Sequence, residues 1–551
     1  MSNTTQPANF TETSTALLET FPVDKGSPST GFITWGAALV FFMTPGLALF
    51  YSGLSKHNNA LSLMMLCMMA MSIVTIQFYL FGFSLAFSER GDAFIGDFKF
   101  SVLDIDSVYS FPHTTPQIPS VVFLVYQMQC ACIAAALIFG SVPERVRFVP
   151  GMVFILVWTT VVYDFVAYWS WSNHGWIRNF GCLKEISNLT STDYHPYCHQ
   201  GAYDFSGGGP IHIASGFSGL AYCLVLGKRR HVHVEHHSLV NVMLGTGILW
   251  FGWFAGSGGA AGASNTRAAV ASTNTTIAGA AGALSWAIFD YFGTRKLSAL
   301  SFCSGAVAGL VAISSAAGFV APWAALIIGI ASSFVCALWT RVKRQFKKRF
   351  GFDDTFAAFS VHGCGGVVGY VLTGVFAQKW VAKLDGTKID GGGIDGNGVQ
   401  VYYQIVAAAA IAGWSFFMSL IFLLLINLIP GLQLRQSKED ERLGGDFAEM
   451  GEVAYRLMIS EPDDDFTDDV PVSHEVGVLA DGKRIAVATD LKDQLPAAIP
   501  AKSGSDDRHP NHSFRLKLLK SKILNAVDGG VEPENNHIFK DVEAQSVPQT
   551  L

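Results

Sequence analysis

Long apolar runs recur along most of this chain, and they constrain its fold more than any other feature. One run covers residues 61–87 without a single charged side chain. That length exceeds the roughly 20 residues that an α-helix needs to cross a bilayer. Of the 551 residues, 50% are apolar and only 15% are charged, so a chain with this many long apolar runs is predicted to be a polytopic membrane protein.

The apolar segments predict an all-α protein with about eleven transmembrane helices. These helices are expected to begin near residues 31, 61, 118, 149, 208, 238, 268, 299, 320, 354 and 401. Lysine and arginine are concentrated in the connections after odd-numbered spans, above all in the run RVKRQFKKR from Arg341 to Arg349. Short cytoplasmic loops accumulate positive charge. We therefore place these connections in the cytoplasm, and with eleven spans the N-terminus then lies outside and the C-terminus in the cytoplasm.

The composition divides the chain into four predicted parts. Residues 1–30 form an extracellular segment, 31–430 the transmembrane domain, 431–456 an ordered cytoplasmic cap, and 457–551 a cytoplasmic tail. The tail contains the acidic run EPDDDFTDD and few apolar clusters. Because such a segment buries little surface to offset the entropy of ordering, we expect it to be mostly disordered and open to cytoplasmic regulators.

Several polar features fall on the predicted outer face. Glycan acceptor sequons occur at Asn3, Asn9 and Asn188, in agreement with the topology drawn from charge. Cys182 and Cys198 share one outer loop and could form a disulfide in an oxidising compartment. The other seven of the nine cysteines lie in or beside apolar spans, where we expect them to be small buried side chains.

An internal repeat is visible in the spacing of aspartate and histidine. Asp204 precedes His212 in DFSGGGPIH, and Asp354 precedes His362 in DTFAAFSVH, with 150 residues between corresponding members. The two copies are five spans apart, and because successive spans alternate in direction, the second copy is inverted. Inverted five-plus-five repeats are typical of transporters whose working site lies near the membrane midplane. Ionisable residues at that depth usually face a cavity or pathway.

The two histidines are candidates for a pore. A neutral imidazole offers one donor and one acceptor nitrogen, so two bonded imidazoles can pass on a small polar molecule or a proton. The alternative is that His212 and His362 are unrelated core residues. Asp204 and Asp354 stand where they can cap the following helices. We expect this structural role for both aspartates, and Asp204, at the end of the outer loop, is also placed to attract cations.

Motifs in order along residues 31–456 resemble the ammonium transporter family (Amt, Mep and Rh proteins), in particular its fungal Mep members. They are MTPGLALFYSGLSK from Met43, GSVPERVRF from Gly140, DFSGGGPIHIASG from Asp204, CSGAVAGLV from Cys303, FSVHGCGGVVG from Phe359, and ERLGGD with GEVAY. The resemblance implies a homotrimer in the plasma membrane, with a separate pore through each subunit. It implies no cofactor, metal, nucleic acid or enzymatic activity.

The resemblance also implies roles for single residues. Trp171 matches the family's outer-vestibule tryptophan, and Asp204 matches the aspartate near the step at which ammonium loses its proton. His212 and His362 match the twin pore histidines, along which ammonia crosses while the proton follows a coupled route. The implied substrates are ammonium or ammonia and methylammonium.

Three positions depart from the family pattern. An alignment without gaps puts Cys130 and Gly256 at the two gating phenylalanines, and Ala260 at the vestibule serine. The loss of a ring or a hydroxyl weakens cation binding by about 0.5–2 kcal/mol for each interaction. We therefore expect reduced affinity, a wider entrance or altered selectivity.

Two other functions fit parts of the sequence. The altered vestibule and the long tail also suit an ammonium sensor with little flux that signals through its cytoplasmic end. An intramembrane metal-dependent hydrolase could use histidines and aspartates, although zinc sites need three or four close ligands and no HExxH motif occurs within a span.

Overall fold

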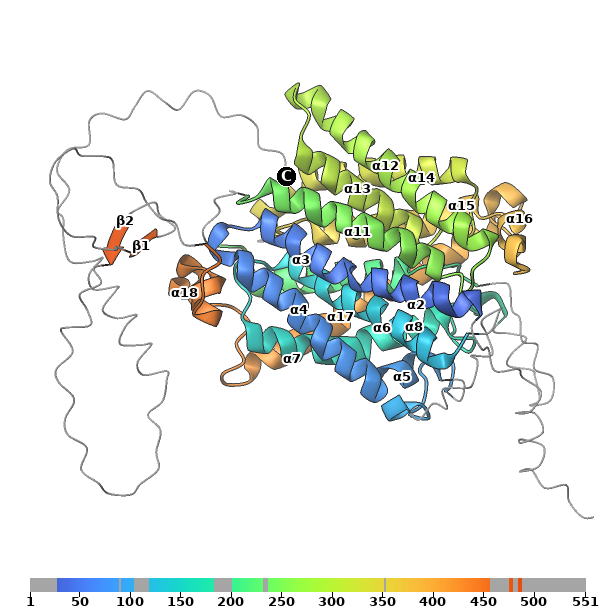
Figure 1. The fold of residues 1–551 in the computed structure, drawn as a ribbon, viewed down its shortest axis with the longest axis horizontal. Helices are drawn as coiled ribbons and strands as arrows, with labels where there is room; N and C mark the ends of the chain where they lie inside the picture. The colour runs from blue at the N-terminus through green and yellow to red at the C-terminus, as the bar shows by residue number, and fades with distance from the viewer. Residues whose placement is uncertain are drawn as a thin grey trace, which may run out of the picture. The chain divides into compact units, whose positions relative to one another are not determined.

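A computed structural model describes residues 27–88, 91–103, 118–182, 201–230, 236–350, 353–455, 475–478 and 484–487. The predicted glycan acceptors Asn3, Asn9 and Asn188 lie outside these residues, as does Cys198 of the predicted disulfide. The chain divides after residue 456 into two units, and the first contains the helices drawn from blue to orange in Figure 1.

The first half of the helical unit contains five apolar spans. Its elements are α2 (Pro28–Phe41), α3 (Met43–Leu54), η1 (His57–Asn59), α4 (Ala60–Gln77), η2 (Phe78–Gly82), α5 (Phe83–Phe87), η3 (Ser101–Leu103), α6 (Ser120–Leu137), η4 (Ile138–Ser141), α7 (Phe148–Trp158), η5 (Thr159–Tyr163), α8 (Asp164–Trp171), η6 (Phe180–Cys182), η7 (Gly208–Ile213) and α10 (Ala214–Leu226). Consecutive elements merge into the longer spans, so that α2 and α3 form one crossing from Pro28 to Leu54.

The second half of the unit repeats this arrangement and adds a last span and a cap. Its elements are α11 (Leu239–Gly259), α12 (Thr266–Thr294), α13 (Ala299–Ser314), α14 (Pro322–Phe350), η8 (Phe359–Cys364), α15 (Gly365–Phe376), α16 (Lys379–Ala382), η9 (Lys383–Asp385), η10 (Gly393–Asp395), α17 (Val399–Leu428), α18 (Lys438–Leu443) and η11 (Asp446–Met450).

The predicted fold class is confirmed. Among the described residues, nine helical segments are long and apolar enough to cross a membrane. The shorter α13 and the more polar α12 pack against each other and against α14, and with them the crossings number eleven. In the polar first part of α12, the Asn274 amide nitrogen donates to the carbonyls of Ala317 and Val320, which lie in the turn between α13 and α14.

The inverted repeat appears in the way the two halves pack. The fifth span begins with the π-helical turn η7 and continues as α10, and the tenth begins with the π-helical turn η8 and continues as α15. The α10 helix packs against η8, while α15 packs against η7. Each half therefore supplies a helix that packs against the π-helical turn of the other half. Such turns are rare in proteins overall, but they occur often at functional sites.

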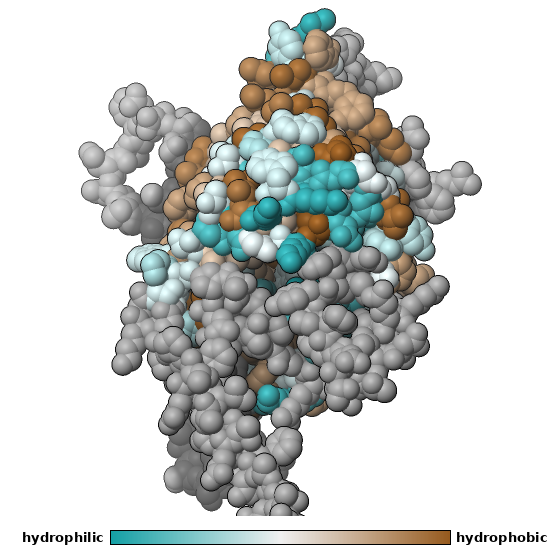
Figure 2. Space-filling view, turned by 90° about the vertical axis from the view of Figure 1, so that its right-hand side faces the viewer, coloured by the Kyte–Doolittle hydropathy of each residue, from teal (hydrophilic) through white to brown (hydrophobic). Residues whose placement is uncertain are grey.

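The molecule shows two kinds of surface. Large apolar side chains on the flanks are exposed, for example Phe251 at 59%, Phe292 at 69% and Phe417 at 61%. In the end-on view of Figure 2, hydrophilic residues gather across the end that carries α16, between hydrophobic flanks. This division suits a protein whose sides contact lipid or other subunits and whose ends contact water.

Residues after α17 fold back onto the starts of α4 and α7. The Asp446 carboxylate accepts hydrogen bonds from the backbone N–H groups of Leu61 and Ser62, at 3.2 and 2.7 Å. Glu449 accepts one from the N–H of Phe148 at 3.1 Å. Two carboxylates of this segment thus satisfy free N–H groups at the starts of α4 and α7, as capping side chains do.

The described residues of the second unit form a short hairpin. Strand β1 (Glu475–Val478) pairs antiparallel with β2 (Arg484–Val487), in a register that sets Glu475 opposite Val487. This hairpin lies in the tail, for which the sequence predicts mostly disorder. Both strands carry β-branched residues, in EVGV and RIAV, which favour extended backbone.

Candidate functional site

The two repeat-related histidines meet in the centre of the helical unit. Nδ1 of His212 lies 3.3 Å from Nδ1 of His362, and the ring centroids are 5.3 Å apart with planes inclined by 24°. Both side chains are buried, with exposures of 2% and 4%. The spacing seen in the sequence therefore corresponds to a direct contact in the structure.

Glycine makes this contact possible. Gly216 of α10 lies so close to Gly363 of η8 that a Cβ atom on Gly216 would collide with the backbone of Gly363. Small residues at such positions let membrane helices approach closely. The π-helical turns that carry His212 and His362 are thereby held against each other.

His212 has two further neighbours that the sequence analysis did not single out. The indole of Trp253 is stacked on the imidazole, with centroids 5.1 Å apart and an interplanar angle of 22°. The hydroxyl of Ser314 lies 3.3 Å from Nε2 of His212 and accepts a hydrogen bond from Nε1 of Trp253 at 2.9 Å. No spacing rule links residues this far apart, so only a structure reveals them.

Asp204 orders the turn before the first histidine. Its carboxylate accepts hydrogen bonds from the N–H groups of Gly207, Gly208 and Gly209, at 2.8, 2.9 and 2.8 Å. Gly207 has a φ of +100°, which a residue with a side chain rarely adopts. Tyr370 adds a fourth hydrogen bond through its hydroxyl at 2.6 Å.

The charge of Asp204 depends on these partners. Burial raises the pKa of Asp204 above its ordinary value, and the hydrogen bonds from Tyr370 and from the three glycine amides act in the opposite direction. If the turn opened, these donors would be lost and would no longer counteract the effect of burial.

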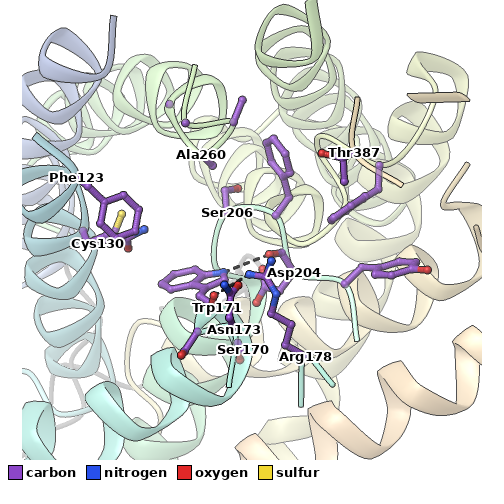
Figure 3. A pocket seen from close by; sticks show the side chains of 18 of the residues that line it. Phe123, Cys130, Ser170, Trp171, Asn173, Arg178, Asp204, Ser206, Ala260 and Thr387 are labelled. Carbon is purple, nitrogen blue, oxygen red and sulfur yellow. Dashed lines mark hydrogen bonds between the residues drawn. The ribbon is translucent and has the colours of Figure 1, made fainter. Parts of the chain in front are cut away.

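A cavity of about 310 Å³ has residues that follow α16 in its wall, among them Asp385 and Thr387, and we name it the outer cavity after the face that the charge pattern predicts. Its wall includes Trp171, Asp204, Cys130, Ala260 and Phe123, which Figure 3 shows around one space. Trp171 is held in place because its Nε1 donates to the backbone carbonyl of Asp204 at 3.2 Å. Four of the residues selected from the sequence thus share one cavity.

Gly256 is placed differently from Cys130 and Ala260, the other two positions that depart from the family pattern. It is not among the described residues that line the outer cavity, and its carbonyl accepts a hydrogen bond from the hydroxyl of Tyr126. The Tyr126 ring also packs against Gly259, where a Cβ atom would collide with it. A tyrosine from α6 therefore occupies the space beside this part of α11.

Asp354 lines neither described cavity. Its carboxylate accepts hydrogen bonds from the Ser141 hydroxyl at 3.0 Å and from the Ser360 N–H at 3.3 Å. These contacts connect η4 to the first residues of η8, so the side chain of Asp354 holds two helical segments together.

A smaller cavity of about 30 Å³, which we name the inner cavity, lies beside His362. It is lined by His362 and Trp253 and mostly by apolar side chains such as Leu47, Leu137 and Val307. This volume is enough for about one water-sized molecule. Among the described residues, no three histidine, cysteine, aspartate or glutamate side chains are grouped as a metal site would need.

The profile of the Ammonium Transporter Family matches residues 31–455. The chain belongs to this family. It is 38% identical to "Ammonium transporter 1" of Schizosaccharomyces pombe, over 81% of this chain and 86% of that protein. It is also 38% identical to "Ammonium transporter MEP2" of Saccharomyces cerevisiae, over 78% and 85% of the two chains.

A solved structure agrees with this assignment. The crystal structure of Mep2 from Candida albicans is 36% identical and has a TM-score of 0.68, covering 79% of this chain and 92% of that chain. The predicted family is thus confirmed, and the chain is a multi-pass membrane protein with the architecture of its fungal relatives.

Proposed function

We propose that this chain transports ammonium across the plasma membrane, and that ammonia crosses between His212 and His362 while the proton follows a coupled route. The observation that carries the proposal is the 3.3 Å contact of two buried imidazoles, of which His362 lines the inner cavity. The names of its relatives, which are ammonium transporters, support the choice of substrate.

The outer cavity supports recruitment of a cation. Asp204 provides a carboxylate in its wall, and the face of Trp171 is available to a small cation. The inner cavity beside His362 is lined mostly by apolar side chains, where a charged ammonium ion would lose its hydration without replacement. Neutral ammonia meets no such barrier, and the imidazoles replace its hydrogen bonds to water.

The proposal includes the arrangement in the membrane. Three copies form a homotrimer with one pore each, with the N-terminus outside and the C-terminus in the cytoplasm. Residues 31–430 carry transport, 431–456 form the cap, and 457–551 are the tail that regulators reach. The apolar flanks of α11 and α17 support contacts with lipid or with other subunits.

The altered vestibule positions are part of the proposal. Cys130 and Ala260 line the outer cavity without an aromatic ring or a hydroxyl. We expect half-saturation above the micromolar range and weak exclusion of methylammonium. A micromolar half-saturation together with strong methylammonium exclusion would contradict this expectation.

Electrical recording of the reconstituted protein during ammonium pulses tests the proposal. The double variant His212→Ala with His362→Ala should lose selective current while it still reaches the membrane. The exposed His57 provides a matched control, since His57→Ala changes an imidazole outside the pore. An unchanged, selective current in the double variant would refute the role given to the pair.

A second candidate is an ammonium sensor with low flux. The observation that favours it is the attachment of the cap through Asp446 and Glu449 to the starts of α4 and α7, which could transmit a change in the pore. Truncation after residue 456 distinguishes the two: a transporter keeps its current, whereas a sensor loses ammonium-dependent growth signalling.

A further inference from the structure

The hydroxyl of Ser314 lies at a branch point of three buried polar groups. It receives a hydrogen bond from Nε1 of Trp253 at 2.9 Å, donates to the carbonyl of Leu310 at 2.9 Å, and lies 3.3 Å from Nε2 of His212. Ser314 has no exposed surface, and Trp253 is 5% exposed. These contacts are therefore made without competition from bulk water.

The number of protons at this branch point is limited. A serine hydroxyl has one hydrogen to donate and two lone pairs to accept with. The indole N–H of Trp253 can only donate, so it uses one lone pair, and the carbonyl of Leu310 can only accept, so it uses the hydrogen. The second lone pair remains for His212, whose Nε2 must then carry a hydrogen.

The competing arrangement would turn the Ser314 hydrogen toward Nε2 of His212. The observed distances favour Leu310, because its carbonyl is 2.9 Å from the hydroxyl oxygen and Nε2 of His212 is 3.3 Å away. The shorter contact lies near the mode for a hydroxyl donor.

The tautomer of His212 determines that of its partner. With hydrogen on Nε2, a neutral His212 presents a lone pair at Nδ1. The 3.3 Å contact between the two Nδ1 atoms needs one donor, so Nδ1 of His362 carries the hydrogen. Nε2 of His362 is then an acceptor, and His362 lines the inner cavity.

We propose that Ser314, held by Trp253, fixes one tautomer order in the histidine pair, so that the pair presents an acceptor nitrogen to the inner cavity. Ser314 is thus a positioning residue for transport, and this part of the inference rests on the proposed function. A molecule that leaves toward the cytoplasm meets a lone pair able to accept one of its N–H or O–H groups. The two ends of the pair are chemically different although the repeats that carry them are related.

The test uses the full-length protein in lipid vesicles with isotope-labelled histidine. Solid-state nitrogen NMR distinguishes a ring nitrogen that carries hydrogen from one that does not. Signals of the pair are assigned from those missing in His212→Gln and His362→Gln variants. We expect hydrogen on Nε2 of His212 and on Nδ1 of His362 in the unaltered protein.

Ser314→Ala should mix the two tautomer orders and lower the initial transport rate by about two- to tenfold, the ratio expected for one hydrogen bond. Ser315→Ala is the matched control: this adjacent buried serine bonds to Thr373 and to the carbonyl of Ala312, and its loss should leave the tautomers unchanged. Trp253→Phe provides a second variant that removes the indole donor but keeps a ring, and it should also mix the orders.

Hydrogen on Nδ1 of His212 in the unaltered protein would overturn the inference, as would an unmixed spectrum in Ser314→Ala. The NMR result does not depend on flux. If the predicted tautomer order is absent but the histidines are still needed for transport, this inference fails and the proposed function stands. If the order is present but the histidines are not needed for transport, the proposed function fails instead.

Discussion

The hydrogen bond from Tyr370 to Asp204 should set the acid limit of transport. The hydroxyl lies 2.6 Å from the carboxylate, and it is one of the donors that counteract the effect of burial on the pKa of Asp204. Tyr370→Phe removes this donor and keeps the ring. The pKa of Asp204 should then rise further above its ordinary value.

The size of the change follows from the strength of the bond. A hydrogen bond to a charged group contributes about 1.5–3 kcal/mol, and one pKa unit corresponds to about 1.4 kcal/mol. The expected rise is therefore about one to two pH units. Because the carboxylate form of Asp204 attracts ammonium, transport is lost as the outside pH falls through this pKa. The acid limb of the pH profile should move to higher pH by the same amount.

Initial currents measured against outside pH, at a fixed ammonium concentration, check this expectation. Tyr402→Phe is the control, since Tyr402 is 57% exposed on α17 and should leave the profile unchanged. Asp204→Asn, which has no carboxylate to protonate, should show low current without an acid limb. An unchanged limb in Tyr370→Phe, or a shift to lower pH, would refute the role of this bond.

Three further variants test other parts of the structure. Ala260→Ser adds a hydroxyl to the wall of the outer cavity and should lower the ammonium concentration for half-maximal current by about two- to tenfold; an unchanged value would contradict the assignment of this wall. Gly216→Ala should push α10 from η8 and abolish current with the protein still in the membrane, whereas Gly247→Ala, with open space around it, should not. Asp446→Ala should lower thermal stability by about 0.5–2 kcal/mol through loss of the cap on α4, as measured by thermal unfolding in detergent, and equal stability would show that the cap is not held there.

Hydropathy predicts the spans because it is a local property of the chain, and the spacing of the repeat predicts one contact between distant residues. The starts of the spans follow from apolar length, and the histidine contact follows from a repeat that places His212 and His362 at equivalent positions. The position of α12 is also predicted, although it begins with the polar stretch TRAAVASTNTT, and its Asn274 amide nitrogen donates to two carbonyls of the turn between α13 and α14.

The partners of the site could not be predicted in this way. Ser314 and Trp253 contact His212 from α13 and α11, and Tyr370 contacts Asp204 from α15, at separations in sequence that no periodic pattern encodes. The space beside Gly256 shows the same limit. A gap-free alignment identifies a missing ring there, but only the fold reveals that the Tyr126 hydroxyl bonds to the Gly256 carbonyl and that Val40 lies where a Cβ atom would point.

The two repeats are related in backbone but not in the side chains that surround the pore. His212, from the first repeat, is bonded by Ser314 and stacked on Trp253, both from the second. His362, from the second repeat, faces a cavity whose first-repeat residues are mainly apolar, such as Leu47 and Leu137. An inverted repeat with identical side chains would give a pore that is the same in both directions. The hydroxyl of Ser314 lies beside His212, and this contact removes that symmetry. The donor at Nε2 of His212 and the acceptor at Nε2 of His362 therefore follow from side chains that the two repeats do not share.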